Sequence, residues 1–269
     1  MLIRKLAATS LLAIAACTLV ACEGMPGMSS GPKALAVADY GPILADPARG
    51  VKLEGQTTAD NADDAARKPA EVLAFSKVAP GQTILELEGG RGWYSEILSK
   101  AIGPTGKLYV QYPAEFGYGD AAYKTRMDAG QLKNATIVKS HFDDYSAIPS
   151  NSVDKVIWIL GPHEIYFVPA NTQGLGDEAK TYAEIKRVLK PGGEFIAMDH
   201  AADKGAPKTI AQTLHRTDPA NVLAAAKAAG LTYVDKSDIL ANPQDDRTKR
   251  VFDATIRRHT DQFLYRFKK

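Results

Sequence analysis

Short apolar runs alternate with amphipathic segments along most of the chain. Apolar, β-branched runs bounded by turn residues predict strands, and apolar residues three and four apart predict helices. The predicted strands cover residues 83–87, 107–111, 135–139, 153–160, 194–199, 232–235 and 262–267. The predicted helices cover residues 34–44, 64–75, 93–102, 121–133, 178–189 and 219–229. Alternating strands and helices predict an α/β fold with a mostly parallel sheet.

The residue composition of the predicted strands and the segments between them indicate where each strand lies in the sheet. Residues 153–160 are almost uniformly apolar, which is typical of a central parallel strand covered on both faces. No further helix pattern separates the last two strands, which favours an antiparallel pair at one edge. We therefore expect a Rossmann-like sheet of seven strands, mostly parallel with an antiparallel edge strand, and helices on both faces.

A glycine-rich turn follows the first strand, and the rest of the fold is expected to be arranged around it. The sequence Glu86-Leu-Glu88-Gly89-Gly90-Arg-Gly92 lies between that strand and a helix beginning at Trp93. Glycines permit tight turns and close approach of a ligand, and ligands of open α/β sheets bind at the carboxyl ends of the strands. The dinucleotide pattern Gly-x-Gly-x-x-Gly fails here, because Ser95 occupies its third glycine position.

The amino terminus has the pattern of a secretory signal peptide. A basic start (Arg4, Lys5) precedes a small apolar stretch to residue 20, which is too short to span a membrane. The following Leu19-Val-Ala-Cys22 resembles the lipobox of bacterial lipoproteins. This resemblance implies cleavage after residue 21 and acylation of Cys22, and Glu23 favours sorting to the outer membrane, facing the periplasm. We expect a signal peptide at 1–21, a flexible tether at 22–33 and a single domain at 34–269.

Charge and cysteine content exclude several classes of function. The chain has 33 basic and 31 acidic residues. Loss of residues 1–21 removes two basic residues and no acid, so the net charge becomes zero. The excess of basic residues that is typical of nucleic-acid binding is therefore missing. Cys17 would leave with the signal peptide and Cys22 would carry lipid, so neither a disulfide nor thiol chemistry is expected in the domain. Membrane contact is expected through the lipid anchor alone.

Several separated motifs together resemble a family of predicted bacterial class I S-adenosylmethionine (SAM)-dependent methyltransferases, many of them exported. The resemblance spans residues 45–269. Its motifs are Arg67-Lys-Pro69, Gly90-Arg-Gly-Trp-Tyr94, Leu189-Lys-Pro-Gly-Gly193, Asp199-His200, Leu214-His-Arg216, Asp245-Asp-Arg247 and Thr260-Asp-Gln-Phe263. The chain departs from the family pattern at Glu88, at Gly161-Pro-His-Glu164 and at Gln262.

The resemblance implies a SAM site built around the glycine turn. Glu86 and the backbone of 88–92 would hold the methionine end of SAM, with Trp93 and Tyr94 beside it. Gln111 would meet the ribose, where an acid is more common, and Asp143 or Asp144 the adenine amine. The full predicted cofactor set is Glu86, Glu88, Gly89, Gly90, Gly92, Trp93, Tyr94, Gln111, Asp143 and Asp144. For Trp93 and Tyr94, packing of the helix against the sheet is an equally good interpretation.

Polar residues that follow the later strands are candidates for catalysis. His163, Glu164, Asp199 and His200 are the predicted catalytic residues, with His163 or His200 removing a proton from a small methyl acceptor. His215 and Arg216 are the predicted substrate residues. Because loops at the carboxyl ends of strands converge, the histidines and acids are expected to line one pocket. Alternatively, Asp199 and His200 satisfy loop backbone groups, and Arg216 pairs with Asp218 or an acid of the tail.

A second class of function remains open from the sequence. SAM has no general supply outside the cytoplasm, so the chain could be an inactive or repurposed methyltransferase fold. It would then bind a small molecule or a divalent metal through His163, His200 and His215. The sequence has no tight His-x-x-x-His spacing that would favour a metal site.

Overall fold

The computed structural model describes residues 32–53, 56 and 58–269. The predicted signal peptide, lipidated Cys22 and most of the tether lie outside the described residues. Residues 32–269 form one compact unit. Within the described residues, every helix is too short or too polar to cross a membrane.

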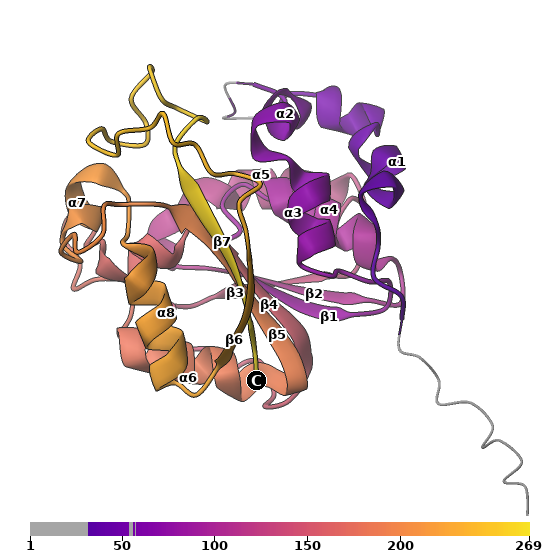
Figure 1. The fold of residues 1–269 in the computed structure, drawn as a ribbon. Coiled ribbons are helices and arrows are strands. Elements are labelled where there is room, and N and C mark those ends of the chain that lie inside the picture. The colour runs from indigo at the N-terminus through magenta and orange to yellow at the C-terminus, as the bar shows by residue number, and fades with distance from the viewer. Residues whose placement is uncertain (1–31, 54–55, 57) are drawn as a thin grey trace, which may run out of the picture. The chain divides into compact units, whose positions relative to one another are not determined.

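A sheet of seven strands forms the centre of the unit, in the order β3-β2-β1-β4-β5-β7-β6 (Figure 1). The strands are β1 (Thr83–Leu87), β2 (Lys107–Tyr112), β3 (Ala135–Lys139), β4 (Val153–Ile159), β5 (Leu189–His200), β6 (Thr232–Ser237) and β7 (Gln262–Lys268). The first five run parallel, and β7 is antiparallel to both of its neighbours, β5 and β6. The predicted fold class is confirmed, with β7 inserted between β5 and the outermost strand β6.

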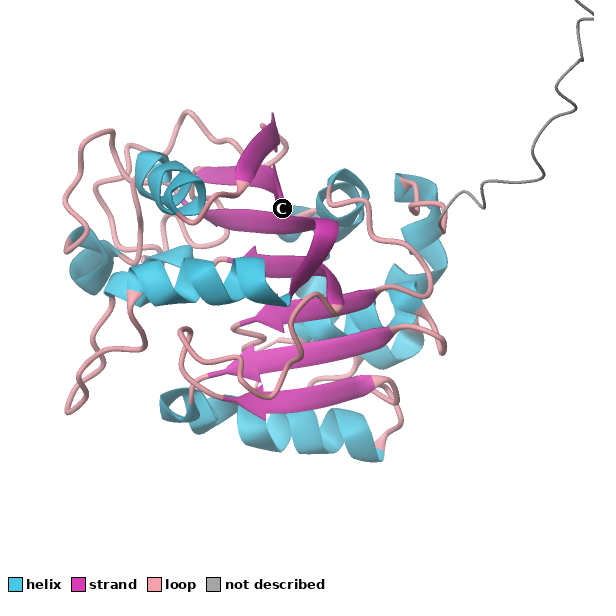
Figure 2. Cartoon of the chain, turned by 90° about the horizontal axis from the view of Figure 1, so that it is seen from below, coloured by secondary structure: helices cyan, strands magenta, loops and turns pink. Residues whose placement is uncertain are grey.

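Helices cover both faces of the sheet, as Figure 2 shows. On one face, α3 (Pro69–Phe75), α4 (Trp93–Ile102) and α5 (Asp120–Asp128) share an apolar core with β1, β2 and β4. On the other face, α6 (Glu178–Val188) and α8 (Pro219–Ala228) pack on β4, β5 and β7. The amphipathic spacing seen in the sequence produces these helices, because each buries its apolar side against the sheet.

Shorter helices occupy the connections and both ends of the sheet. They are η1 (Val37–Tyr40), α1 (Gly41–Leu44), η2 (Pro47–Gly50), η3 (Asp60–Asp63), α2 (Asp64–Arg67), η4 (Ala114–Gly119), η5 (Pro162–Tyr166) and α7 (Ile210–Leu214).

Three predicted boundaries differ from the structure for local backbone reasons. The helix predicted at 64–75 is split into α2 and α3 by Lys68, whose φ of 44° is left-handed. The helix predicted at 121–133 ends at Asp128, and Gly130 then adopts a φ of 72°. Strand β5 begins at Leu189 rather than 194, so the Pro191-Gly-Gly193 turn predicted from the sequence belongs to the strand.

The strand register aligns the loops that carry the candidate residues. Leu87 of β1 lies opposite Gln111 of β2 on one side and Trp158 of β4 on the other. Ile159 of β4 lies opposite Met198 of β5. The loops after β1, β2, β4 and β5 therefore emerge at the same edge of the sheet, where ligands bind in open α/β folds.

Candidate functional site

A cavity of about 430 Å³ opens at the carboxyl ends of β1 and β4. Its wall includes six of the predicted cofactor residues, namely Glu86, Glu88, Gly89, Gly90, Trp93 and Tyr94. Further wall residues are distant in sequence: Gln56, Thr58, Ala59, Asp60, Asp63 and Arg67, Tyr118 in η4, and Arg257 and Arg258 of the tail. Gly92 does not line the cavity. It has a φ of 82° and is the residue before the first turn of α4.

The glycine turn has the backbone that its sequence predicts, with one strained position. Gly90 and Gly92 have φ values of 58° and 82°, which glycine adopts without steric cost. Gly89 has no room for a side chain, because Tyr123 and Val110 pack against it. Glu88 also has a positive φ, 54°, which disfavours a residue that carries a Cβ.

Glu86 places a buried carboxyl group at the start of the turn. Its Oε2 accepts a 2.5 Å hydrogen bond from the hydroxyl of Ser95, in the first turn of α4. Burial raises the pKa of Glu86 to about 7, although the hydrogen bond from Ser95 and the charge of Arg126 act in the opposite direction. Glu86 therefore changes charge near neutral pH, in a cavity where a ligand could decide its ionisation.

Trp93 and Tyr94 combine both roles that the sequence left open. The Trp93 indole donates to the carbonyl of Asp60 at 2.9 Å, and the guanidinium carbons of Arg49 and Arg67 lie 5.3 Å and 4.7 Å from its ring centre. It thereby fixes the amino-terminal segment against α4 while forming part of the cavity wall. The hydroxyl of Tyr94 is buried and has no hydrogen-bond partner among the described residues. An unpaired buried hydroxyl is costly, so this atom is suited to bonding a ligand.

Gln111, Asp143 and Asp144 lie outside the cavity wall, in contrast to the sequence prediction. Gln111 is fully buried; its Oε1 accepts from the backbone N–H of Glu88 at 3.2 Å, and its Nε2 donates to the carbonyl of Ser140 at 2.6 Å. Asp143 accepts from the N–H of Asp177, and Asp144 from that of Ser146. In this structure each of these three side chains holds a loop, and none of them lines the cavity.

The segment after β2 closes one side of the cavity. Gly119, at the end of η4, packs so tightly on Gly90 that a side chain there would collide with the Gly90 carbonyl oxygen. Tyr118 beside it is half exposed and lies under the guanidinium of Arg91. The cavity therefore extends from the glycine turn toward residues 56–67 and 257–258.

Four of the six predicted catalytic and substrate residues form a buried cluster beside the cavity. His163 and Glu164 belong to η5, Asp199 is the second-last residue of β5, and His215 follows α7. The Nδ1 atom of His163 lies 2.9 Å from Oδ1 of Asp199, and its Nε2 lies 3.2 Å from Glu164 and 3.3 Å from Nδ1 of His215. The sequence correctly predicted that these loops converge. However, these side chains are at most 9 % exposed and form a packed cluster that does not line the cavity.

The cluster has a polarised charge distribution. Burial alone would lower the pKa of His163, but Asp199 and Glu164 raise it well above its usual value. Burial would raise the pKa of Glu164, but its hydrogen bonds to His163 and His215 lower it. Glu88, a residue of the cavity wall, also senses the charge of this cluster. Burial raises the pKa of its carboxyl group most, and the charge of Glu164 raises it further.

His200 stands apart from the other histidines. Its Nδ1 lies 2.6 Å from the hydroxyl of Thr260, and its ring centre lies 6.3 Å from that of His163. Burial, followed by the positive charge of His163, lowers the pKa of His200 well below its usual value. His200 is therefore neutral at neutral pH, which is the form a proton acceptor needs.

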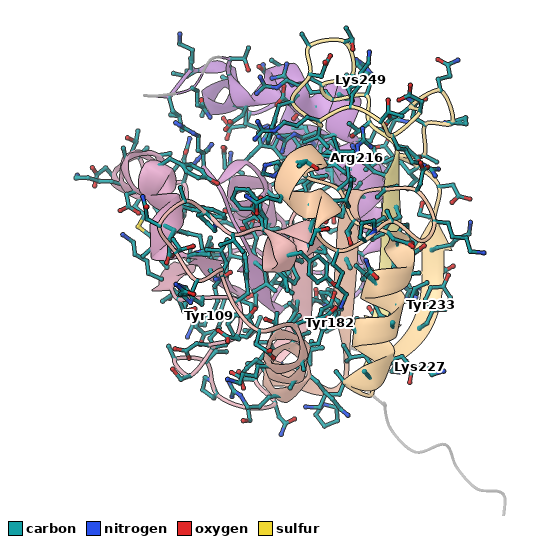
Figure 3. The ribbon with its side chains drawn as sticks, turned by 90° about the vertical axis from the view of Figure 1, so that its left-hand side faces the viewer. Tyr109, Tyr182, Arg216, Lys227, Tyr233 and Lys249 are labelled. Atoms are coloured by element: carbon teal, nitrogen blue, oxygen red, sulfur yellow. The ribbon has the colours of Figure 1, made fainter. Side chains whose placement is uncertain are left out.

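Arg216 stabilises the tail instead of facing a ligand. Its guanidinium is fully buried, pairs with Asp245 at 2.8 Å, and donates through Nε to the carbonyl of Lys249 at 3.0 Å. Figure 3 shows Arg216 and Lys249 near the same end of the molecule, away from Lys227 and Tyr233. Of the two interpretations open from the sequence, pairing with an acid of the tail describes this residue.

One side of the cavity is basic, and no pattern in the sequence indicates a ligand role for it. Arg67, Arg91, Arg257 and Arg258 all line it. Arg258 bonds Asp63 at 2.6 Å, which joins the tail to the amino-terminal segment. Arg67 and Arg91 lay within motifs of the resemblance, whereas the adjacent Arg257 and Arg258 lie in a loop with no periodic signal.

The chain is similar to known proteins in fold and, more weakly, in sequence. No protein-family model matches the chain. The ubiquinone/menaquinone biosynthesis C-methyltransferase UbiE of Escherichia coli is 27 % identical over 124 residues, which cover 46 % of this chain and 45 % of UbiE. The chain thus matches less than half the length of this curated relative.

Two solved structures represent the likeness in fold. A SAM-dependent methyltransferase from Aquifex aeolicus has a TM-score of 0.54 at 22 % identity, covering 77 % of this chain and 97 % of that chain. The [4+2]-cyclase SpnF has a TM-score of 0.56 at 14 % identity, covering 88 % of this chain and 97 % of that chain. Because one of these is named as a cyclase, the shared fold alone does not fix the reaction. The sheet order and these likenesses show that the chain has the α/β fold of class I SAM-dependent methyltransferases.

Proposed function

We propose that the protein is a SAM-dependent methyltransferase that binds the amino-acid end of SAM at its glycine turn. The observation that carries this proposal is the cavity at the end of β1, where Glu86 and the backbone of the glycine turn meet. An ionised Glu86 would attract the ammonium group of SAM, and the arginines of the wall would attract its carboxylate. The unpaired hydroxyl of Tyr94 supplies a further polar contact.

The cavity suits the amino-acid end of SAM better than its nucleoside end. Gln111 has both polar side-chain atoms engaged, and η4 packs directly on Gly90. Binding of the ribose therefore requires η4 to move away from Gly90. SAM, when bound, would supply an electrophilic methyl group.

The residues of the chain would bind the acceptor and remove its proton. His200 does not line the cavity, but it is the better candidate for a base than His163, because it is neutral and Thr260 holds one ring nitrogen, whereas His163 already carries its proton. Both ring nitrogens of His163 are already engaged within the cluster. We propose a small methyl acceptor, placed between the glycine turn and the arginines of the tail. We also propose lipid anchorage at Cys22 in the cell envelope, on the amino-terminal sequence alone.

Calorimetric titration of SAM and S-adenosylhomocysteine tests this function. The full-length protein, purified in mild detergent, is compared with Gly90→Asp and Gly103→Asp. Both glycines have a positive φ and open space at the Cβ position, but only Gly90 lines the cavity. We expect micromolar binding by the wild type and by Gly103→Asp, and at least tenfold weaker binding by Gly90→Asp. A folded wild type that binds neither compound contradicts the proposal and favours a repurposed binding protein.

A further inference from the structure

Three potential metal-ligand atoms meet in the buried cluster beside the cavity. They are Nε2 of His163, Oε1 of Glu164 and Nδ1 of His215. The residues come from η5 and from the loop after α7, about fifty positions apart in sequence, so no short motif announces them. Two imidazole nitrogens and one carboxylate oxygen form a ligand set suited to zinc and neighbouring transition metals rather than to calcium or magnesium.

The spacing of these atoms matches that of a tetrahedral site. The three separations are 3.2 Å from His163 to Glu164, 3.3 Å from His163 to His215, and 3.6 Å from His215 to Glu164. Zinc bonds of about 2.0–2.1 Å at tetrahedral angles place any two ligand atoms roughly 3.3 Å apart. A cation of that size therefore fits between the three atoms with little movement.

The groups around the three atoms also favour a cation. Asp199 holds Nδ1 of His163 at 2.9 Å, which directs Nε2 toward Glu164 and His215, as in carboxylate–histidine–zinc sites; the cation displaces the proton that Nε2 carries in the charged ring. Glu164 is 7 % exposed, and its Oε2 is buried with no hydrogen-bond partner among the described residues. A buried carboxylate oxygen without a donor is costly, and a cation would compensate it.

We propose that His163, Glu164 and His215 bind one divalent cation of the zinc class, with a fourth coordination position left open. Asp199 is a positioning residue that orients His163. The inference is independent of SAM binding, because none of these side chains belongs to the wall of the cavity.

Besides the loss of the Nε2 proton of His163, one contact must change when the cation binds. An N–H of Arg250 lies 3.1 Å from Nε2 of His215, so Nε2 accepts a hydrogen bond and the proton resides on Nδ1. A cation at Nδ1 moves this proton to Nε2, where it would face the Arg250 donor. Because Arg250 is exposed, its side chain can turn away. Arg250 therefore opposes binding, and its removal should increase the affinity.

Titration with Zn²⁺ and Co²⁺ tests the site directly. Full-length protein is first stripped with a chelator, and affinity is measured by calorimetry, the absorption of bound Co²⁺ and the rise in unfolding temperature. We expect one ion per chain with the spectrum of tetrahedral cobalt. Glu164→Gln and His215→Asn should each weaken binding at least a hundredfold, and Asp199→Asn about 10- to 100-fold. Asparagine tolerates the left-handed backbone of His215, whose φ is 52°.

Two further variants keep the test decisive if a cluster variant fails to fold. His141→Ala removes an exposed histidine outside the cluster and should leave affinity unchanged. Arg250→Gln should bind at least as tightly as the wild type, and we expect a severalfold gain. The proposal is overturned if the wild type binds no stoichiometric ion. It is equally overturned if binding survives in Glu164→Gln and His215→Asn, or is lost in Arg250→Gln.

Discussion

The carboxylate of Asp199 holds His163 by two different groups. Its Oδ2 accepts from the backbone N–H of His163 at 2.6 Å, while its Oδ1 lies 2.9 Å from the ring Nδ1. The same Oδ1 also accepts from the N–H of His200 at 2.7 Å. One fully buried side chain therefore connects the end of β5 to η5 and fixes the orientation of an imidazole.

Asp199→Asn should destabilise the protein strongly. The amide retains the shape of the carboxylate but loses the charge that compensates His163, and loss of one partner of a buried pair costs about 3–5 kcal/mol. Urea denaturation should show a decrease of that order in the free energy of unfolding. Asp144→Asn, an exposed loop acid, is the control and should change it by less than about 0.5 kcal/mol. Equal effects of the two variants would show that the pairing with His163 contributes little.

Glu88→Gly should stabilise the protein. The backbone at Glu88 has a φ of 54°, which costs a residue with a Cβ about 1 kcal/mol, and the substitution also removes a buried carboxylate oxygen without a partner. We expect a gain of about 1–2 kcal/mol in the free energy of unfolding. Gly90→Ala, with a φ of 58° nearby, should cause a loss of about 1 kcal/mol. Destabilisation by Glu88→Gly would mean that the carboxylate makes a favourable interaction exceeding the strain.

Glu86 should make stability depend on pH near neutrality. Its pKa is about 7 in the folded chain against an ordinary value of 4.5 for an exposed glutamate, so folding takes up a proton between these values. The contribution of Glu86 to stability is therefore fully present below pH 4.5 and is lost as pH rises from 4.5 through about 7, by about 3 kcal/mol in total. Glu86→Gln, which resembles the protonated acid, should lack this loss. Ser95→Ala removes the hydrogen bond that lowers the pKa of Glu86, so its transition should move to higher pH.

The same titration predicts the pH dependence of cofactor binding. If the ionised Glu86 binds the ammonium group of SAM, the affinity of the wild type should increase as pH rises through about 7. The affinity of Glu86→Gln should be lower and should not show this increase. Calorimetry across that pH range measures both. An increase of the same size in Glu86→Gln would assign the pH dependence to another group.

Arg126→Met should release the segment that forms one wall of the cavity. The guanidinium is buried and bonds Asp60 at 2.6 Å, Glu96 at 2.7 Å and the carbonyl of Arg91 at 3.0 Å. Its loss leaves the buried Asp60 without a cationic partner, whereas Glu96 keeps Lys100, so we expect about 3–5 kcal/mol of destabilisation. Hydrogen exchange should become faster in the described part of residues 56–67. Lys124→Met, on an exposed side of α5, should leave exchange there unchanged.

Most of the fold could be predicted from the sequence because its determinants are local. The apolar runs at 83–87 and 153–159 and the amphipathic spacing at 178–188 follow directly from the period of strands and helices. Asp218 and Pro219 marked the start of α8 through the capping preferences of helices, and the Asp218 carboxylate accepts from the N–H of Ala220. The predicted boundaries were wrong where a single left-handed residue, such as Lys68, interrupts a periodic pattern.

The candidate site was predicted in part. The glycine turn and the convergence of His163, Asp199 and His215 follow from strand order, because parallel strands bring their carboxyl ends to one edge. The roles of Gln111, Asp143 and Arg216 could not be predicted from the sequence, since each role depends on a hydrogen-bond or charge partner far away in sequence. A polar residue at a strand end can face a ligand or satisfy a loop, and only the position of its partners distinguishes these roles.

The sequence by itself determined the α/β architecture, the glycine turn and the residues available at the ends of the strands, because periodicity and turn chemistry act over a few residues. Tertiary structure decided which of those residues face the cavity and which are buried. It placed Arg257 and Arg258 opposite Glu86, closed η4 on Gly90, and brought Glu164 within 3.6 Å of His215. These relationships depend on packing between segments separated by many residues, which no local pattern encodes.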